Sequence, residues 1–121
     1  MDFSKINDRD QAEAGAFCHF CHPDPDSPMF DGDKPVGAMV RGMEAFSVRK
    51  ALTRISSKGI TGQAAGIALV KALVVNFVNV ERAGSPLTTS DDDIAWLLDR
   101  SSVFERQIIE TASALGNAPN T

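Results

Sequence analysis

The chain has 121 residues, which is the length of one domain with one hydrophobic core. With 43% hydrophobic and 23% charged residues, its composition is typical of a soluble globular protein. The formal net charge of -4 argues against nucleic acid as a partner, because phosphate binding needs a clustered basic surface.

The distribution of apolar residues disfavours secretion and membrane insertion. Residues 1–15 are polar and lack the apolar segment of a secretory signal. The most apolar stretch, residues 64–80, contains Lys71 and Asn76 and is shorter than the ~20 residues of a membrane-spanning helix. We therefore expect a cytoplasmic protein with no membrane partner, in which a disulfide is not favoured.

The first third of the chain predicts a β-hairpin over about residues 16–41. Residues 1–15 offer little to bury, so we expect them to be flexible. Aromatic residues favour a strand over residues 16–22, and alternating apolar residues favour a second one over residues 36–41. The connection is rich in Asp and Pro and long for a hairpin, which makes it a candidate for ordering on binding.

Four helices are expected after the hairpin, which gives an α+β fold that is mostly α. Their apolar residues recur at helical spacing over about residues 46–57, 61–78, 90–100 and 102–115. The β-branched end of the second helix, from Val74 to Val80, could instead be a strand, because periodicity alone does not separate the two.

The expected helix ends carry capping residues. Thr61 and the pair Thr89-Ser90 stand at the starts of two helices, and Ser102 with Glu105 has the spacing of a capping box. Gly59 fits a left-handed stop after the first helix. We expect residues 117–121 to be a flexible tail.

Both cysteines and both histidines lie within five residues. The spacing Cys18-x-x-Cys21-His22 is that of covalent haem attachment, with His22 as one axial ligand. The second axial ligand would be Met29, Met39 or Met43. Against haem, such attachment occurs in exported proteins, and Pro23 follows where a cytochrome would begin a helix.

A zinc site is the second chemical alternative, because Cys18 and Cys21 have zinc-knuckle spacing and His19 and His22 would complete four ligands. Side chains alternate along a strand, which places Cys18 and His22 on one face and His19 and Cys21 on the other. One chain would then have to bend strongly to close the site, whereas two chains could share an ion. We favour a plain strand with core cysteines and solvated histidines, and expect no cofactor.

No catalytic constellation is visible in the sequence. Prolines interrupt the acidic loop of residues 24–33, and no Glu closes it as a calcium loop requires. The run Asp91-Asp92-Asp93 suits the positive first turn of a helix. Because both histidines lie on one short segment, a Ser-His triad is not favoured, and we expect a protein that is not an enzyme.

The helix expected over residues 61–78 is apolar on nearly every side, more than a small domain can bury by itself. We expect the excess face to meet another chain, as a homo-oligomer or by holding a partner helix in a groove. Contact candidates are Ile67, Val70, Val74, Phe77 and, as an aromatic anchor, Trp96. For each residue taken singly, we favour the alternative that it belongs to the domain's own core.

Four segments together resemble a known family layout and cover about 100 residues. They are the loop from Pro23 to Asp33, the strand and basic helix VGAMVRGMEAFSVRKAL (36–52), the apolar segment and turn VVNFVNVERAGSPLTTS (74–90), and DDDIAWLLDRSSVFERQIIETASALGN (91–117). Their order resembles the tail assembly chaperones of long-tailed, siphovirus-type bacteriophages. The resemblance gives no role to the Cys/His segment.

The resemblance implies a non-enzymatic assembly factor of a phage or prophage, with a single domain over residues 1–121. Such proteins bind the tape-measure protein, keep its long hydrophobic helices soluble and help to recruit tail tube protein. They act in the host cytoplasm and are absent from the finished virion. Two alternatives stay open: a small metal- or haem-binding protein using residues 18–22, and a structural minor tail or head-tail protein.

Overall fold

A computed structural model of the protein describes residues 13–22 and 27–116. Within these residues the chain forms seven short strands and four helices of ten residues or more. This is the mostly helical α+β architecture that the sequence predicts. The segments 1–15 and 117–121, which we expected to be flexible, lie outside the described residues apart from residues 13–15.

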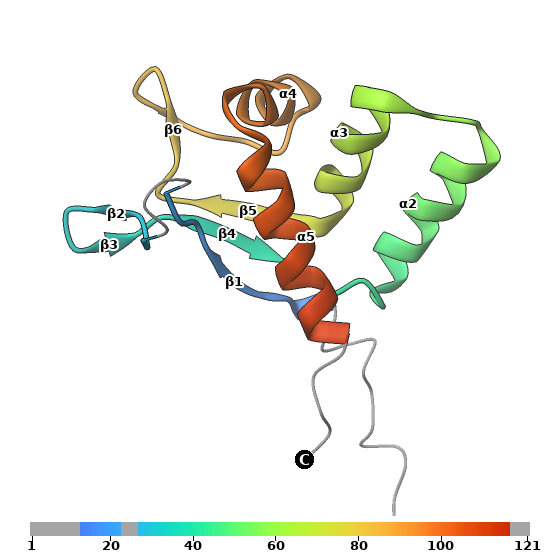
Figure 1. Cartoon of the computed structure of the whole chain (residues 1–121), viewed down its shortest axis with the longest axis horizontal. Helices are drawn as coiled ribbons and strands as arrows, with labels where there is room; N and C mark the ends of the chain where they lie inside the picture. Colours follow the sequence, from blue (N-terminus) through green and yellow to red (C-terminus); the bar gives the residue numbers. More distant parts are fainter. Residues whose placement is uncertain (1–12, 23–26, 117–121) are drawn as a thin grey trace, which may run out of the picture.

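A three-stranded antiparallel sheet is central to the fold, with the strand order β1-β4-β5. Its strands are β1 (Ala16–His19), β4 (Gly37–Val40) and β5 (Val74–Val78). The pairing of β1 with β4 confirms the predicted hairpin. β5 comes from a distant part of the chain and joins the other edge of β4 (Figure 1).

Two small hairpins extend from the sheet on the left of Figure 1. They pair β2 (Phe30–Asp31) with β3 (Lys34–Pro35), and β6 (Glu81–Arg82) with β7 (Ser85–Pro86). The long connection predicted as a loop therefore contains a hairpin of its own. The strand predicted over residues 16–22 is shorter than expected, because β1 ends at His19 and Cys21 forms only an isolated bridge with Pro28.

The helices are α2 (Phe46–Ser57), α3 (Gly62–Leu73), α4 (Asp91–Arg100) and α5 (Ser102–Gly116). α5 crosses one face of the sheet, while α3 packs against α2, α4 and α5 (Figure 1). α2 lies at the outer edge of the molecule and packs against α3.

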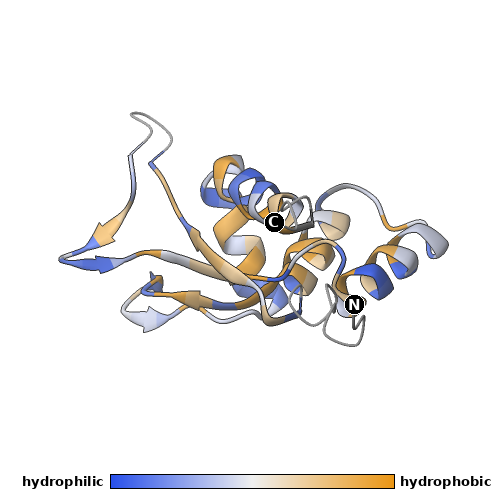
Figure 2. Ribbon diagram, turned by 90° about the horizontal axis from the view of Figure 1, so that it is seen from below, coloured by the Kyte–Doolittle hydropathy of each residue, from blue (hydrophilic) through white to orange (hydrophobic). Residues whose placement is uncertain are grey.

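The hydrophobic core lies where the sheet meets the helices, and apolar residues are concentrated there in Figure 2. Its buried side chains come from all three strands of the sheet and all four helices, and the largest fully buried ones are Phe20, Leu73, Ile94, Ile108, Val40, Val48 and Val70. One face of the sheet is thereby removed from water, which is the main favourable term for a domain of this size.

Two of the predicted helix ends are confirmed by their capping geometry. Gly59 has φ +63°, and the next amide, that of Ile60, donates to the carbonyl oxygen of Ile55 at 3.0 Å, which closes a Schellman turn. At the start of α4, the Ser90 hydroxyl oxygen accepts from the amide of Asp93 at 3.2 Å.

The two other predicted starts differ in detail. Thr61 is the N-cap residue of α3, but its side chain forms no capping hydrogen bond. The predicted capping box at Ser102 is wrong by one position, because the hydroxyl of Ser101 accepts from the amide of Val103 at 3.2 Å. Ser101 also ends α4, so a single residue separates the two helices.

The helix predicted over residues 61–78 is wrong in its last third. α3 ends at Leu73, and the following residues form β5, which is the alternative that β-branching left open. Pairing with β4 places this segment in the sheet, with Val74 buried opposite Val40. Arg41 holds the junction: its amide donates to the Leu73 carbonyl at 2.7 Å, and its guanidinium donates to the carbonyl of Ala72 at 2.9 Å.

The close approach of β1 and β4 at Gly37 yields a testable prediction. A methyl group on Gly37 would clash with the carbonyl oxygen of Cys18 and press on the ring of Phe17 at 3.0 Å. We predict that Gly37→Ala lowers the free energy of unfolding by about 1–3 kcal/mol, because backbone atoms cannot move aside cheaply. Urea unfolding followed by circular dichroism measures this loss.

Gly66→Ala is the matched control. Gly66 lies inside α3, and the atom nearest to its added methyl group is a carboxylate oxygen of Glu105 at 3.0 Å, at the end of a flexible side chain. This variant should be neutral or gain up to about 1 kcal/mol, since alanine is the better helix former. Equal losses in both variants would contradict the tight packing of β1 on β4.

Candidate partner-binding site

A groove of about 400 Å³ runs between α2 and α3. The two helices are consecutive and joined by the short turn at residues 58–61, so they pack side by side. We call this feature the α2–α3 groove; it is lined by Ala51, Arg54, Ile55, Ile60, Ala64, Ile67, Ala68, Lys71 and Asp91.

Most of the groove wall is apolar but not buried. Six of its nine residues are alanine or isoleucine; Ala64 is exposed and the other five are half-buried. On α3, Ala64, Ala68 and Lys71 share one side because they are four and three residues apart. The small alanine side chains leave room for side chains from another molecule.

Charged residues border the apolar wall. Arg54 stands on the α2 side, and Lys71 on α3 forms an ion pair with Asp91 of α4 at 2.9 Å. Both members of that pair are largely exposed, so it contributes little to stability.

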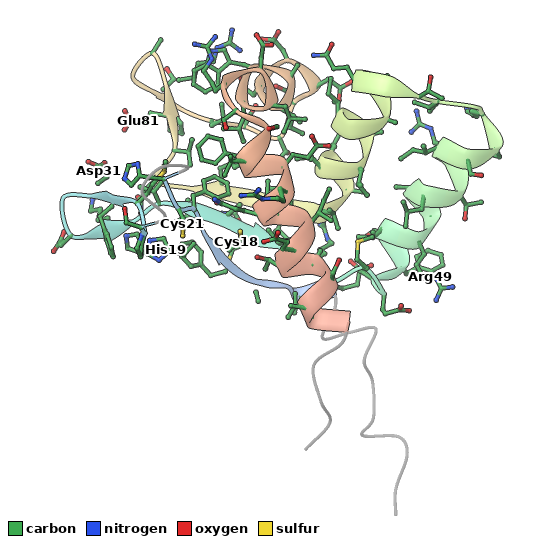
Figure 3. The ribbon with its side chains drawn as sticks, in the orientation of Figure 1. Cys18, His19, Cys21, Asp31, Arg49 and Glu81 are labelled. Carbon is green, nitrogen blue, oxygen red and sulfur yellow. The ribbon has the colours of Figure 1, made fainter. Side chains whose placement is uncertain are left out.

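The outward side of α2 carries a second surface, which we call the basic face of α2; it is formed by Phe46, Arg49, Lys50, Thr53 and Arg54. Arg54 belongs to both surfaces. Phe46 is 66% exposed and shares this surface with Arg49, which projects outward in Figure 3. Arg49 pairs with Glu44 at 3.0 Å, whereas Lys50 and Arg54 form no ion pair with any other residue that the structure describes.

Positive charge is concentrated on α2. Residues 46–58 contain four basic and no acidic residues, whereas the remaining 108 residues contain eight basic and sixteen acidic ones. All four basic residues, Arg49, Lys50, Arg54 and Lys58, are exposed. An acidic protein therefore presents one basic helix beside an apolar groove.

The structure separates the five residues expected to contact a partner. Ile67 lines the α2–α3 groove. Val70 and Val74 lie in the core with 0% and 2% exposure, which is the alternative that we favoured for each residue singly. Phe77 is half-buried against the core, with its backbone opposite Ala38 in the sheet.

Trp96, the fifth contact candidate, is half-buried between two guanidinium groups. Arg82 and Arg100 lie 5.4 and 5.1 Å from its ring centroid, within the range of cation–π attraction. Arg82 also pairs with Asp92 and Asp93, at 2.9 and 3.1 Å. Trp96 therefore fastens the β6–β7 hairpin to α4 and offers little free ring surface.

The carboxylate of Asp93 completes this attachment. It accepts hydrogen bonds from the hydroxyl and the amide of Thr88 at 2.7 and 2.8 Å. These bonds, and the contact with Arg82, hold the pKa of Asp93 below its usual value. The start of α4 is thereby fixed to the segment before it.

The apolar surplus is smaller than the sequence suggested. It was inferred for a helix that continued to residue 78, but α3 ends at Leu73 and the next residues enter the sheet. Val74 is consequently buried inside the chain itself. What remains accessible on α3 is the groove side around Ala64 and Ile67.

The Cys/His segment packs mainly as an ordinary strand. Cys18 as a residue is 3% exposed, its thiol donates to the carbonyl oxygen of Gln107 at 3.5 Å, and burial raises the pKa of this thiol. On the other face, the His19 ring lies against Phe17 and donates from Nε2 to the carbonyl oxygen of Met29 at 2.7 Å. His22 is exposed.

Gln107 of α5 bonds the backbone of Cys21, two residues beyond the end of β1. Its side-chain amide accepts from the amide of Cys21 at 3.0 Å and donates to the carbonyl oxygen of the same residue at 3.1 Å. At Cys21 the side chain thus takes the place of a neighbouring strand, so the backbone of this one residue is satisfied and unavailable for pairing with another chain.

This arrangement supports neither the zinc site nor the haem attachment that the sequence left open. Among the residues that the structure describes, no three His, Cys, Asp or Glu side chains are placed to hold a metal ion. For haem attachment, both thiols would have to reach one macrocycle, but the Cys18 thiol is buried between β1 and α5 (Figure 3).

Sequence reasoning missed most of the α2–α3 groove. Ile55, Ile60, Ala64 and Ala68 were not among the contact candidates, and Phe46 was taken only as the start of a helix. Small residues on facing sides of two consecutive helices carry a weak signal, because the same pattern also serves close helix packing.

Comparison of the chain with protein-family models, with curated proteins and with solved structures gave no match. In the described part of the chain, no helix is both long and apolar enough to span a bilayer.

The unequal burial of the two thiols predicts unequal reactivity. Cys18 is buried with a raised pKa, whereas Cys21 is only half-buried. Since the thiolate is the reactive form, we predict that iodoacetamide modifies Cys21 roughly tenfold faster or more in the native protein. Mass spectrometry of the variants Cys18→Ser and Cys21→Ser measures each thiol by itself. Equal rates in native buffer would contradict the burial of Cys18, and urea should abolish any difference.

Proposed function

We propose that this protein is a tail assembly chaperone of a long-tailed bacteriophage or prophage, and that it binds helices of the tape-measure protein. The proposal joins the segment layout described above to one observation, the accessible apolar groove between α2 and α3. A groove between two helices is a common way to hold the apolar face of a third.

The remaining parts of the proposal follow from that role. The protein acts in the host cytoplasm without enzymatic activity, helps to recruit tail tube protein and is left out of the mature virion. Its excess of acidic residues supports solubility while it holds an apolar partner. Self-association is part of the proposal, since Phe17 and Phe30 are 37% and 56% exposed.

The first test is co-expression with the tape-measure protein of the phage or prophage that encodes this chain. We expect the tagged chain to retain the tape-measure protein on an affinity column and to raise its soluble fraction. Ile67→Ala should weaken this retention by about tenfold, because it removes an apolar contact from the wall of the groove.

Ile109→Ala is the matched control, since Ile109 is also a half-buried helical isoleucine packed against the core but does not line the groove. Each variant should lose a similar ~1–2 kcal/mol of stability, and only Ile67→Ala should lose the partner. No association of the wild-type chain, together with a strictly monomeric state by light scattering, would refute the chaperone proposal. Stoichiometric amounts in purified virions would favour a structural tail protein instead.

A further inference from the structure

We propose that the α2–α3 groove and the basic face of α2 form one binding surface that selects amphipathic helices whose apolar stripe is flanked by acidic side chains. This inference deepens the proposed function, because it names the chemistry of the partner segment. It requires only a helical partner, so it can be tested apart from the identity of the tape-measure protein.

The apolar half of the surface fits side chains rather than a flat contact. Ala51 lines the α2 side of the groove and Ala64 and Ala68 line the α3 side, and the larger Ile55, Ile60 and Ile67 also belong to its wall. Small residues between larger ones leave recesses, and residues three or four apart on a bound helix would enter these recesses together.

The charged half of the surface lies along α2, and its unpaired charges are positive. Lys50 and Arg54 lie beside the groove with no ion-pair partner among the described residues, and Lys58 follows at the end of the same helix. An acidic flank on the bound helix would supply the missing partners. Rim charges of this kind contribute little affinity singly, but they set which partner is accepted and make binding depend on salt.

Phe46, the first residue of α2, adds an apolar side chain at the N-terminal end of the surface. It is the most exposed large apolar side chain in the described part of the chain and lies within the basic face of α2. An aromatic side chain that shares its surface with Arg49, Lys50 and Arg54 suits a helix carrying apolar and acidic residues. Phosphate backbones offer no apolar side chains to fill the groove, so nucleic acid does not fit the whole surface.

Helix α4 of a second copy, whose first turn carries three carboxylates, is a weaker occupant. The acidic turn that starts α4 is engaged within its own molecule, with Asp91 held by Lys71 and both Asp92 and Asp93 held by Arg82. Those carboxylates would have to leave existing ion pairs to meet the basic face of another copy.

The test uses two fluorescent synthetic peptides of about 20 residues, long enough for about five helical turns. They share one leucine and alanine stripe, and their flanking positions are all glutamate in one peptide and all lysine in the other. Fluorescence anisotropy with the full chain should show the glutamate peptide binding at least about tenfold more tightly, with the difference shrinking as salt rises from about 0.05 M to about 0.5 M.

Paired variants locate the binding. The double variant Lys50→Glu/Arg54→Glu should lose the preference for the glutamate peptide. The control double variant Lys34→Glu/Arg106→Glu makes the same change of charge away from the surface and should keep that preference. Ala64→Trp should block the groove, and Ala114→Trp, an exposed alanine on α5, should not. Circular dichroism verifies that each variant is folded.

Equal binding of both peptides, or no binding of either, would overturn the inference. A third outcome would also overturn it: the wild-type chain binds neither peptide but self-associates, and the double variant Lys50→Glu/Arg54→Glu does not self-associate. The occupant of the surface would then be a second copy of the chain. If the glutamate peptide binds as described but the tape-measure protein does not, only the proposed function fails. If the tape-measure protein binds and none of the surface variants weakens it, only the inference fails.

Discussion

The change from helix to strand between Leu73 and Val74 is the constraint on which the rest of the structure depends. Arg41, the residue after β4, fixes it by donating to the carbonyl oxygens of Ala72 and Leu73 at the end of α3. Because β5 then pairs with β4, a segment more than thirty residues away in sequence completes the sheet beside the hairpin. The same junction sets where the end of α3 meets the sheet. Because α2 packs against α3, it also places α2 at the edge of the molecule.

This junction also divides the apolar residues of the segment into two groups. Those beyond it enter the sheet, where Val74 is buried while Val75 remains 40% exposed. Those before it line either the core, as Val70 does, or the groove, as Ile67 does. Helical spacing places both residues on an apolar helix, but only the position of α2 decides which of them remains accessible.

Elements whose signals are local could be predicted from the sequence. α2 spans the residues predicted for it, Gly59 ends it, and Ser90 caps α4, because capping depends on side chains a few residues apart. The hairpin of β1 and β4 was predicted from alternation, although its connection proved more ordered than a loop. The part of the binding surface that was predicted is Ile67, since the other groove residues carry no pattern of their own.

The sequence by itself determined the class of fold, the ends of most helices, the concentration of positive charge on α2 and the separation of Cys18 from His19 across a strand. These follow from composition, short-range hydrogen bonding and the two-residue repeat of β-structure. Only the tertiary structure decided that residues 74–78 form a strand, that Trp96 is held between two arginines, and that α2 and α3 leave a groove. Each of these depends on a partner distant in sequence, and no local pattern specifies which distant segment will supply it.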